Sequence, residues 1–223
     1  MKPRVNIVYF PGTNCHRETI AAFTKVGANA RLVFAEDACD GKDRIDDADV
    51  VCLPGGFSYG DHIRGGMVAA ALLSLGLASQ LEACKQKPLL CICNGFQIGV
   101  KAGFFGQGVT LAVNASGTFL HRTSQRHIVP EDHGTLWLAG LERQTLTFPC
   151  AHGEGRFFFT ERRGWHPALR YPSAENPDGS LEDIAGITDS TGRIFGLMDH
   201  PERAQHRDLN LTIFENGVKA VAA

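Results

Sequence analysis

The sequence lacks a long hydrophobic run and an excess of either charge, and each absence excludes a class of protein. The longest apolar stretch, residues 67–78, contains Ser74 and Gly76 and is too short to cross a bilayer, so we expect no membrane association. The apolar run near the start breaks at Pro11, which favours a first core strand over a signal peptide. The formal net charge is -2, which argues against nucleic-acid binding through bulk electrostatics.

Paired cysteines, zinc-type spacings and phosphate loops are also missing. The number of cysteines is seven, which is odd, and several lie in apolar segments, so reduced thiols and a cytoplasmic location fit better than a disulfide framework. Cys91 and Cys93 have no second pair at matching spacing, and we therefore predict no metal site. No Gly-x-x-x-x-Gly-Lys-Ser/Thr loop is present, and residues 103–108 lack the context of a dinucleotide site.

The first half of the chain alternates between strand-like and helical patterns. The predicted strands are 5–10, 30–35, 49–53 and 88–93, and the predicted helices are 18–26, 67–87 and 94–102. Alternation with short links predicts parallel strands joined by right-handed crossovers.

The second half has a different pattern of short strands separated by Gly, Pro and Asp. The candidates are 109–113, 118–122, 146–150, 155–159, 184–188 and 193–198, with a hairpin turn at 189–192 and a closing helix at 208–221. No repeat or linker is visible, and the length suffices for one large core. We predict one α/β domain over 1–223, with a mixed, mostly parallel central sheet flanked by helices and a β-rich elaboration in its second half.

Cys93 is the candidate nucleophile because of its place in the chain. It ends a buried strand and begins a helix, whose free N–H groups favour a thiolate. The amide of Asn94 would point at an oxyanion beside the sulfur, and Gly95 permits the close strand–helix approach of a nucleophile elbow. The alternative is a buried core cysteine, as most cysteines are. Cys15, which follows a strand and Pro-Gly-Thr-Asn, is the one rival thiol.

A candidate base and orienting acid lie far downstream. His200 and Glu202 flank Pro201, which favours an extended backbone, and in an extended chain residues i and i+2 project to the same side. The carboxylate would then hold the imidazole in the tautomer whose other nitrogen serves Cys93. The alternative is an exposed loop acid beside an unrelated histidine.

Two glycine-rich segments complete the candidate site. Gly55 and Gly56 end the third strand, where backbone amides can approach a substrate or an oxyanion, although a plain turn has the same pattern. Residues 151–157 are polar and glycine-rich, which fits either the wall of a polar pocket or a hairpin turn.

These residues resemble a known family. The segments 11–15, 55–61, 92–97, 151–157 and 200–203 resemble those of class I (triad-type) glutamine amidotransferases, and more narrowly the glutaminase subunits of phosphoribosylformylglycinamidine synthase, across nearly the whole chain. The resemblance implies a flavodoxin-like, class I glutamine amidotransferase domain.

The resemblance also implies a reaction. Cys93 would attack the side-chain amide of glutamine, His200 would move the protons, and Glu202 would orient His200. Gly56 and Asn94 would form the oxyanion hole. The substrate-binding residues would be Gly55, Gln97, His152 and Gly153.

The product ammonia would pass to a large synthetase subunit, accompanied by a small bridging subunit, for de novo purine synthesis. ATP and Mg²⁺ would bind that synthetase and not this chain. Three alternatives remain open: a glutaminase serving another synthetase, a cysteine hydrolase or chaperone-like protein of similar fold, and a non-catalytic regulatory subunit.

Two positions depart from the family pattern. Cys91 replaces a glycine two residues before the nucleophile, which makes it the expected place of strain. Asp199 replaces a proline, and a carboxylate beside His200 is expected to raise the pKa of the histidine.

Overall fold

The computed structural model describes residues 1–129, 134–173, 175–203 and 207–222. Its largest feature is a nine-stranded sheet in the order β2-β1-β3-β4-β11-β10-β9-β6-β7, and β5 and β8 form a separate two-stranded sheet. The strands are β1 (Arg4–Tyr9), β2 (Asn29–Phe34), β3 (Val50–Leu53), β4 (Leu89–Ile92), β5 (Val109–Ala112), β6 (Leu120–Ile128), β7 (Thr145–His152), β8 (Arg156–Phe159), β9 (Trp165–Arg170), β10 (Ile184–Asp189) and β11 (Ile194–Leu197). The α-helices are α1 (His16–Lys25), α2 (Ala35–Cys39), α3 (Met67–Gly76), α4 (Ala78–Cys84), α5 (Asn94–Lys101) and α6 (Arg207–Lys219). Short 3-10 turns are η1 (Ser58–Asp61), η2 (Leu136–Leu138), η3 (Leu181–Asp183) and η4 (Pro201–Arg203).

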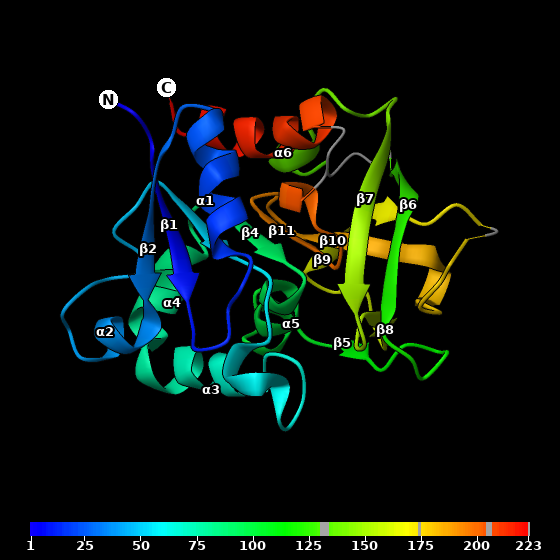
Figure 1. The fold of residues 1–223 in the computed structure, drawn as a ribbon, viewed down its shortest axis with the longest axis horizontal. Coiled ribbons are helices and arrows are strands. Elements are labelled where there is room, and N and C mark those ends of the chain that lie inside the picture. The colour runs from blue at the N-terminus through cyan, green and yellow to red at the C-terminus, as the bar shows by residue number, and fades with distance from the viewer. Residues whose placement is uncertain (130–133, 174, 204–206, 223) are drawn as a thin grey trace.

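The five strands from β2 to β11 are parallel, and helices cover both faces of this half (Figure 1). All residues of β3, β4 and β11 are buried, which explains why these strands read as continuous apolar runs rather than alternating ones. Helices α1 and α6 contact each other, as do α3 and α5. The carboxyl ends of β3 and β4 lie side by side, where open parallel sheets place their ligands.

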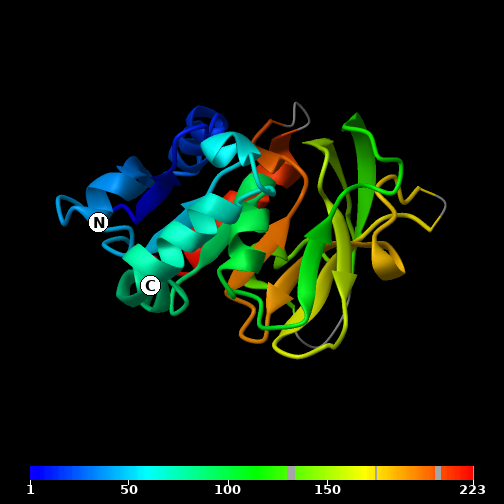
Figure 2. The same cartoon turned by 90° about the horizontal axis from the view of Figure 1, so that it is seen from below.

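The remaining four strands are antiparallel and form the predicted β-rich elaboration. Strand β10 pairs with β11 and β9, and the long β6–β7 hairpin closes the sheet through a short pairing of β6 with β9. Figures 1 and 2 show this half beside the helix-covered half, and the pairing of β10 with β11 joins the two into one sheet. The predicted mixed, mostly parallel α/β architecture is therefore confirmed.

Several predicted elements differ from those observed. The helix expected over 67–87 is wrong as a single element, because α3 ends at Gly76, α4 begins at Ala78 and the two are bent by 102°. Leu77 between them has a non-helical φ of -129° and is buried. Its neighbour Gly76 is a weak helix former, so the helix can end there while the side chain of Leu77 is buried. Strand β9 was missed because Pro167 within it argues against a strand.

In the described part of the chain no single helix is long and apolar enough to span a membrane. Among the described helices one bent pair, α3 and α4, is long and apolar enough when taken together, by length and composition alone.

Candidate active site

Cys93 lies at a strained turn between β4 and α5. Its φ is 51° and its ψ is -109°, a backbone conformation that a non-glycine residue adopts only at an energetic cost. The turn is tight because Gly95 presses against β3: a Cβ at that position would lie 1.9 Å from the backbone oxygen of Leu53. The expected tight turn from strand to helix, with Gly95 permitting the close approach of α5 to β3, is present in the structure.

Cys91 is not the place of strain. It lies inside β4, is fully buried, and its thiol points at Gly99 on α5, where an added Cβ would be 3.1 Å from the sulfur. The elbow therefore tolerates a thiol in place of hydrogen because the facing helix has a glycine. The positive φ belongs to Cys93 itself.

His200 and Glu202 touch, although not in the way the sequence suggested. The Nδ1 atom of His200 lies 2.7 Å from Oε1 of Glu202, and both side chains are buried. The backbone is not extended, because Arg203 N–H donates to the carbonyl of His200 and closes the 3-10 turn η4. Proline suits the first position of a helical turn as well as an extended segment, so the predicted geometry was wrong while the predicted contact is present.

Gly55 is the point at which the site converges. A Cβ there would lie 2.8 Å from Cε1 of His200, 3.0 Å from Sγ of Cys15 and 3.4 Å from Cβ of Cys93. The three side chains can therefore surround this backbone only because it has no side chain of its own. Gly55 leaves the space that these side chains occupy.

The imidazole of His200 sits among acidic groups. Burial lowers its pKa, but its interactions with Glu202, Cys93 and Cys15 outweigh burial, so the pKa lies well above the ordinary histidine value. Because Nδ1 faces Glu202, Nε2 is the nitrogen available to the thiol of Cys93.

Asp199 pairs mainly with Arg126 rather than with His200. Its carboxylate forms a bidentate ion pair with Arg126, with N–O distances of 2.8 and 2.6 Å, and both side chains are buried. Burial raises the pKa of Asp199, whereas the positive charges of Arg126 and His200 lower it. The carboxylate therefore does favour the charged imidazole, as expected, but its main partner is Arg126, and the larger effects on the pKa of His200 come from burial, Glu202 and Cys93.

The rival thiol, Cys15, belongs to the same site. Its sulfur lies 3.9 Å from Nδ1 of His200 and accepts a hydrogen bond from Arg203 Nη2 at 2.7 Å. Cys15 begins α1 without an elbow, and its sulfur is on the Glu202 side of the imidazole. A cavity of about 230 Å³ is lined by Cys15, Cys93 and His200, among others.

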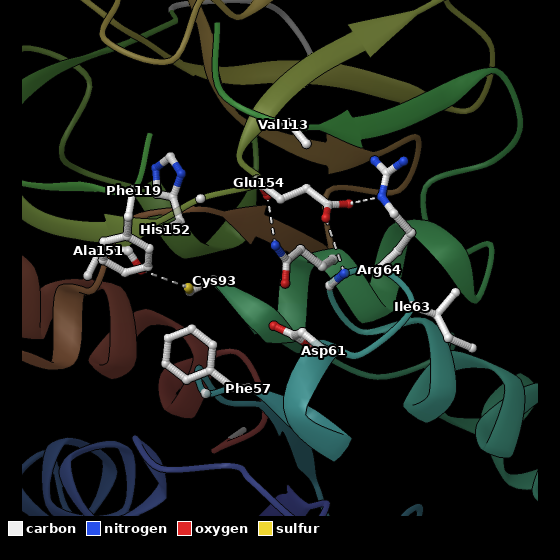
Figure 3. A pocket seen from close by; sticks show the side chains of 14 residues that line it. Phe57, Asp61, Ile63, Arg64, Cys93, Val113, Phe119, Ala151, His152 and Glu154 are labelled. Atoms are coloured by element: carbon white, nitrogen blue, oxygen red, sulfur yellow. Dashed lines mark hydrogen bonds and ion pairs between the residues drawn. The ribbon is translucent and has the colours of Figure 1, made fainter. Parts of the chain in front are cut away.

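A second cavity, of about 430 Å³, opens on the other side of Cys93 (Figure 3). Its lining includes Gly56, Gln97 and Gly153, all named from the sequence. Gly56 has no room for a side chain, since a Cβ would lie 2.6 Å from the backbone of Thr13, and Asn94 opens α5, where the first amides have no partner within the helix. Asn94 follows Cys93 directly in the chain, and Gly56 lines the same cavity as Cys93.

The two side chains predicted to bind substrate, those of Gln97 and His152, differ in how they face the cavity. Gln97 lines the cavity, but its amide accepts from Asn94 Nδ2 at 2.8 Å and donates to the carbonyl of Glu154 at 2.7 Å. His152 is buried, with Nδ1 3.2 Å from Asn114 Oδ1 and its ring packed against Gly155. Figure 3 shows this ring turned away from Cys93. Burial, then the charges of His200 and Arg126, lower the pKa of His152 to about 4, so the ring is neutral and braces the loop.

The sequence reasoning missed three charged residues around this cavity. Glu154 accepts from Arg64 Nε at 2.9 Å and from the Gly65 amide at 3.2 Å. Asp61 accepts from the Gly66 amide and from Asn94 Nδ2 through one carboxylate oxygen, Oδ1. Asp61 and Glu154 belong to the glycine-rich segments 55–61 and 151–157, and a charged residue directly after a glycine was the signal available to find them.

Comparison with known proteins places these motifs in a family. The model of the CobB/CobQ-like glutamine amidotransferase domain matches residues 2–217. The PurQ subunit of phosphoribosylformylglycinamidine synthase from Campylobacter jejuni is 38% identical over 211 residues, which cover 90% of this chain and 87% of that protein. The corresponding subunit from Thermotoga maritima is 36% identical over 206 residues, with 92% and 89% covered.

Solved structures agree with the sequence comparison. A chain in the structure of PurLQS from Thermotoga maritima superposes with a TM-score of 0.84 at 32% identity, covering 99% of both chains. A putative GMP synthase subunit from Thermoplasma acidophilum shares the fold, with a TM-score of 0.66 at 15% identity, covering 100% of this chain and 95% of that chain. The chain therefore belongs to the CobB/CobQ-like glutamine amidotransferase family and, within it, to the group of the PurQ subunits of phosphoribosylformylglycinamidine synthase.

Proposed function

We propose that this chain is the glutaminase subunit of a phosphoribosylformylglycinamidine synthase. The observation that carries the proposal is Cys93 on its elbow, beside the buried His200–Glu202 pair, in a chain related to PurQ proteins over most of its length. Residues 1–223 form one glutamine amidotransferase domain. It hydrolyses glutamine to glutamate and ammonia, and it acts in the cytoplasm.

The reaction begins with the Cys93 sulfur attacking the side-chain carbonyl carbon of glutamine. His200 takes the thiol proton through Nε2 and gives it to the departing nitrogen, so that ammonia leaves and a glutamyl thioester remains. Water then attacks the thioester while His200 accepts its proton. Glutamate is released, and His200 returns the proton to the Cys93 sulfur. Glu202 holds Nδ1 of His200 throughout.

Both tetrahedral intermediates carry a negative oxygen next to Cys93. The amides of Gly56 and Asn94 donate to it, and in comparable sites one such donor is worth about 3–4 kcal/mol of transition-state stabilisation. Because both amides lie on backbone fixed by packing of Gly56 and Gly95, no reorganisation is needed when the charge forms.

The 430 Å³ cavity accommodates the rest of the substrate. Asp61 uses one carboxylate oxygen, Oδ1, for its protein contacts, and its other oxygen accepts from the α-ammonium group of glutamine. Arg64, partly exposed and held by Glu154, faces the α-carboxylate. Gln97 and the loop at His152 and Gly153 shape the wall, and Gly55 contributes backbone only.

The ammonia is used by a partner. A large synthetase subunit, assembled with this chain and a small bridging subunit, converts formylglycinamide ribonucleotide to formylglycinamidine ribonucleotide in purine biosynthesis. ATP and Mg²⁺ bind to that synthetase. The support is the relationship to PurQ proteins and the superposition on a chain of PurLQS.

The test uses the chain combined with the synthetase and bridging subunits of the same organism. Cys93→Ala should lower glutamine-dependent product formation by about 10³-fold or more and abolish the glutamyl thioester, because no nucleophile remains. Product formation from ammonium chloride should stay at the wild-type rate, and wild-type glutaminase activity should rise when the partners are added.

The matched control is Cys39→Ala, which removes an exposed thiol outside the site and should leave both rates unchanged. Persistent glutaminase activity in Cys93→Ala would disprove the nucleophile. Active glutaminase without any synthesis in the reconstituted mixture would instead remove the purine assignment.

A further inference from the structure

Arg126 and Asp199 form a buried ion pair that the proposed reaction does not use. Arg126 Nε and Nη2 donate to the two carboxylate oxygens of Asp199 at 2.8 and 2.6 Å, and the two side chains are 0% and 1% exposed. Asp199 immediately precedes His200. A buried pair of this kind gives little net stability by itself, because removing both charges from water is costly. Its position beside the catalytic imidazole therefore needs another explanation.

The guanidinium is fixed from every side. Arg126 lies on β6, where Nη1 donates to Ser124 Oγ at 2.8 Å and to the carbonyl of Gln125 at 2.6 Å. Its plane lies 4.0 Å from the ring centre of Tyr171, whose hydroxyl donates to Asp178 Oδ2 at 2.7 Å. The planar fork is thus held in one orientation, the arrangement that makes a bidentate contact with a carboxylate precise.

The other end of the pair is the backbone that carries His200. Asp199 forms an isolated antiparallel bridge with Cys150 of β7, and His200 N–H donates to the carbonyl of Pro149 at 2.9 Å. The Asp199 side chain points to Arg126, whereas the His200 side chain points to Glu202 and the Gly55 backbone. The ion pair therefore anchors the backbone at Asp199 on one side, while the imidazole of His200 projects from the other side.

We propose that Arg126 is a positioning residue for His200: it anchors the backbone before the histidine, and it offsets the negative charge of Asp199 that would otherwise act in full on the imidazole. This inference rests on the proposed glutaminase activity. The titratable or charged groups around His200 are Glu202, Cys93, Cys15, Asp199, Arg203 and His152, and those around Asp199 are Arg126, Asp178, Tyr171, Cys150 and His200.

The proposal predicts that removing Arg126 and removing the charge of Asp199 shift the pH dependence of kcat/KM in opposite directions. In Arg126→Met an unpaired carboxylate stands next to His200, so the histidine pKa rises and the acid limb of kcat/KM for glutamine moves to higher pH. In Asp199→Asn an unpaired guanidinium remains, so the limb moves to lower pH. Each shift should be about one pH unit or more, as expected of a neighbouring unit charge at an effective dielectric constant near 20.

The double variant Arg126→Met/Asp199→Asn separates charge from anchoring. It contains neither charge, so the limb should return to the wild-type position. The bidentate anchor is still missing, so kcat should stay about tenfold below wild type with KM for glutamine unchanged. Arg126→Lys, which keeps the charge and loses the fork, should leave the limb in place and recover part of kcat.

The measurement is the pH dependence of glutamine hydrolysis by the complex with the synthetase, with Arg122→Met as control. Arg122 is an exposed arginine on the same strand, and its removal should not move the limb. The proposal would be overturned if the acid limb of kcat/KM lay at the same pH in all folded variants, or if the variants changed KM alone. If Arg126→Met does not fold, Asp199→Asn against the double variant decides the same question. An inactive wild-type complex would refute the glutaminase assignment instead.

Discussion

Replacing Gly55 with alanine tests whether the open space at this glycine holds the site together. The added Cβ would lie 2.8 Å from Cε1 of His200, whereas carbon atoms in contact normally stay about 3.5–4.0 Å apart. The imidazole must therefore move by about 0.7–1.2 Å, because the backbone of Gly55 is bound to Cys15 N–H through its carbonyl. A displacement of about 1 Å costs up to about 10²-fold in rate, so we expect kcat to fall about 10- to 100-fold, or about 1.4–2.7 kcal/mol.

The assay is steady-state glutamine hydrolysis by the reconstituted complex, together with urea unfolding of the isolated variant. KM should change little, because the methyl group is directed at His200, Cys15 and Cys93, the three side chains that surround it. Overpacking should also cost about 1–3 kcal/mol of stability. The matched control is Gly134→Ala, where nothing lies within 4 Å of the added Cβ. A kcat within about twofold of wild type would refute the steric reasoning, and a raised KM at unchanged kcat would instead support the expected substrate-binding role of Gly55.

Two further predictions concern charge. Glu202→Gln removes the carboxylate that helps to raise the pKa of His200. A histidine pKa raised in the folded state stabilises the fold fully below the unfolded pKa of about 6.5, and this stabilisation is lost as the pH rises through the folded-state pKa. In urea titrations the variant should therefore lose most stability below about pH 6.5 and less at higher pH. A deficit that grows with pH would contradict this sign. Asp61→Asn should raise KM for glutamine about tenfold or more with a small change in kcat, because a charged hydrogen bond to the α-ammonium group is lost; an unchanged KM would exclude Asp61 from the substrate site.

Much of the parallel half of the fold was predictable because its determinants are local. Strands β3 and β4 are continuous apolar runs that end at glycine-containing turns, and α5 follows Cys93 directly. The elbow was also predictable, since a strand, a cysteine and a glycine two residues later occupy adjacent positions in the chain. By contrast, the break at Leu77 and strand β9 with Pro167 depend on burial, which overrides local preference.

In the candidate site, too, some features were predictable from neighbouring residues and others were not. The contact of His200 with Glu202 was expected because two residues separated by one proline can touch in either an extended or a turned backbone, while the observed 3-10 turn was not. Cys15 was weighed as a rival of Cys93, and the tertiary structure instead brings it to the opposite side of the same imidazole. The partner of Asp199 was invisible because Arg126 is 73 residues away in the chain.

The sequence alone determined the alternation of strands and helices, the thiol at the turn and the acid beside the histidine, because these follow from the periodicity and spacing of neighbouring residues. Only the tertiary structure decided which charges act on His200 and which glycine leaves room for it. Those properties depend on burial and on distances of a few ångströms between β3, β4, β6 and the turn at η4, segments that meet only once the sheet has formed.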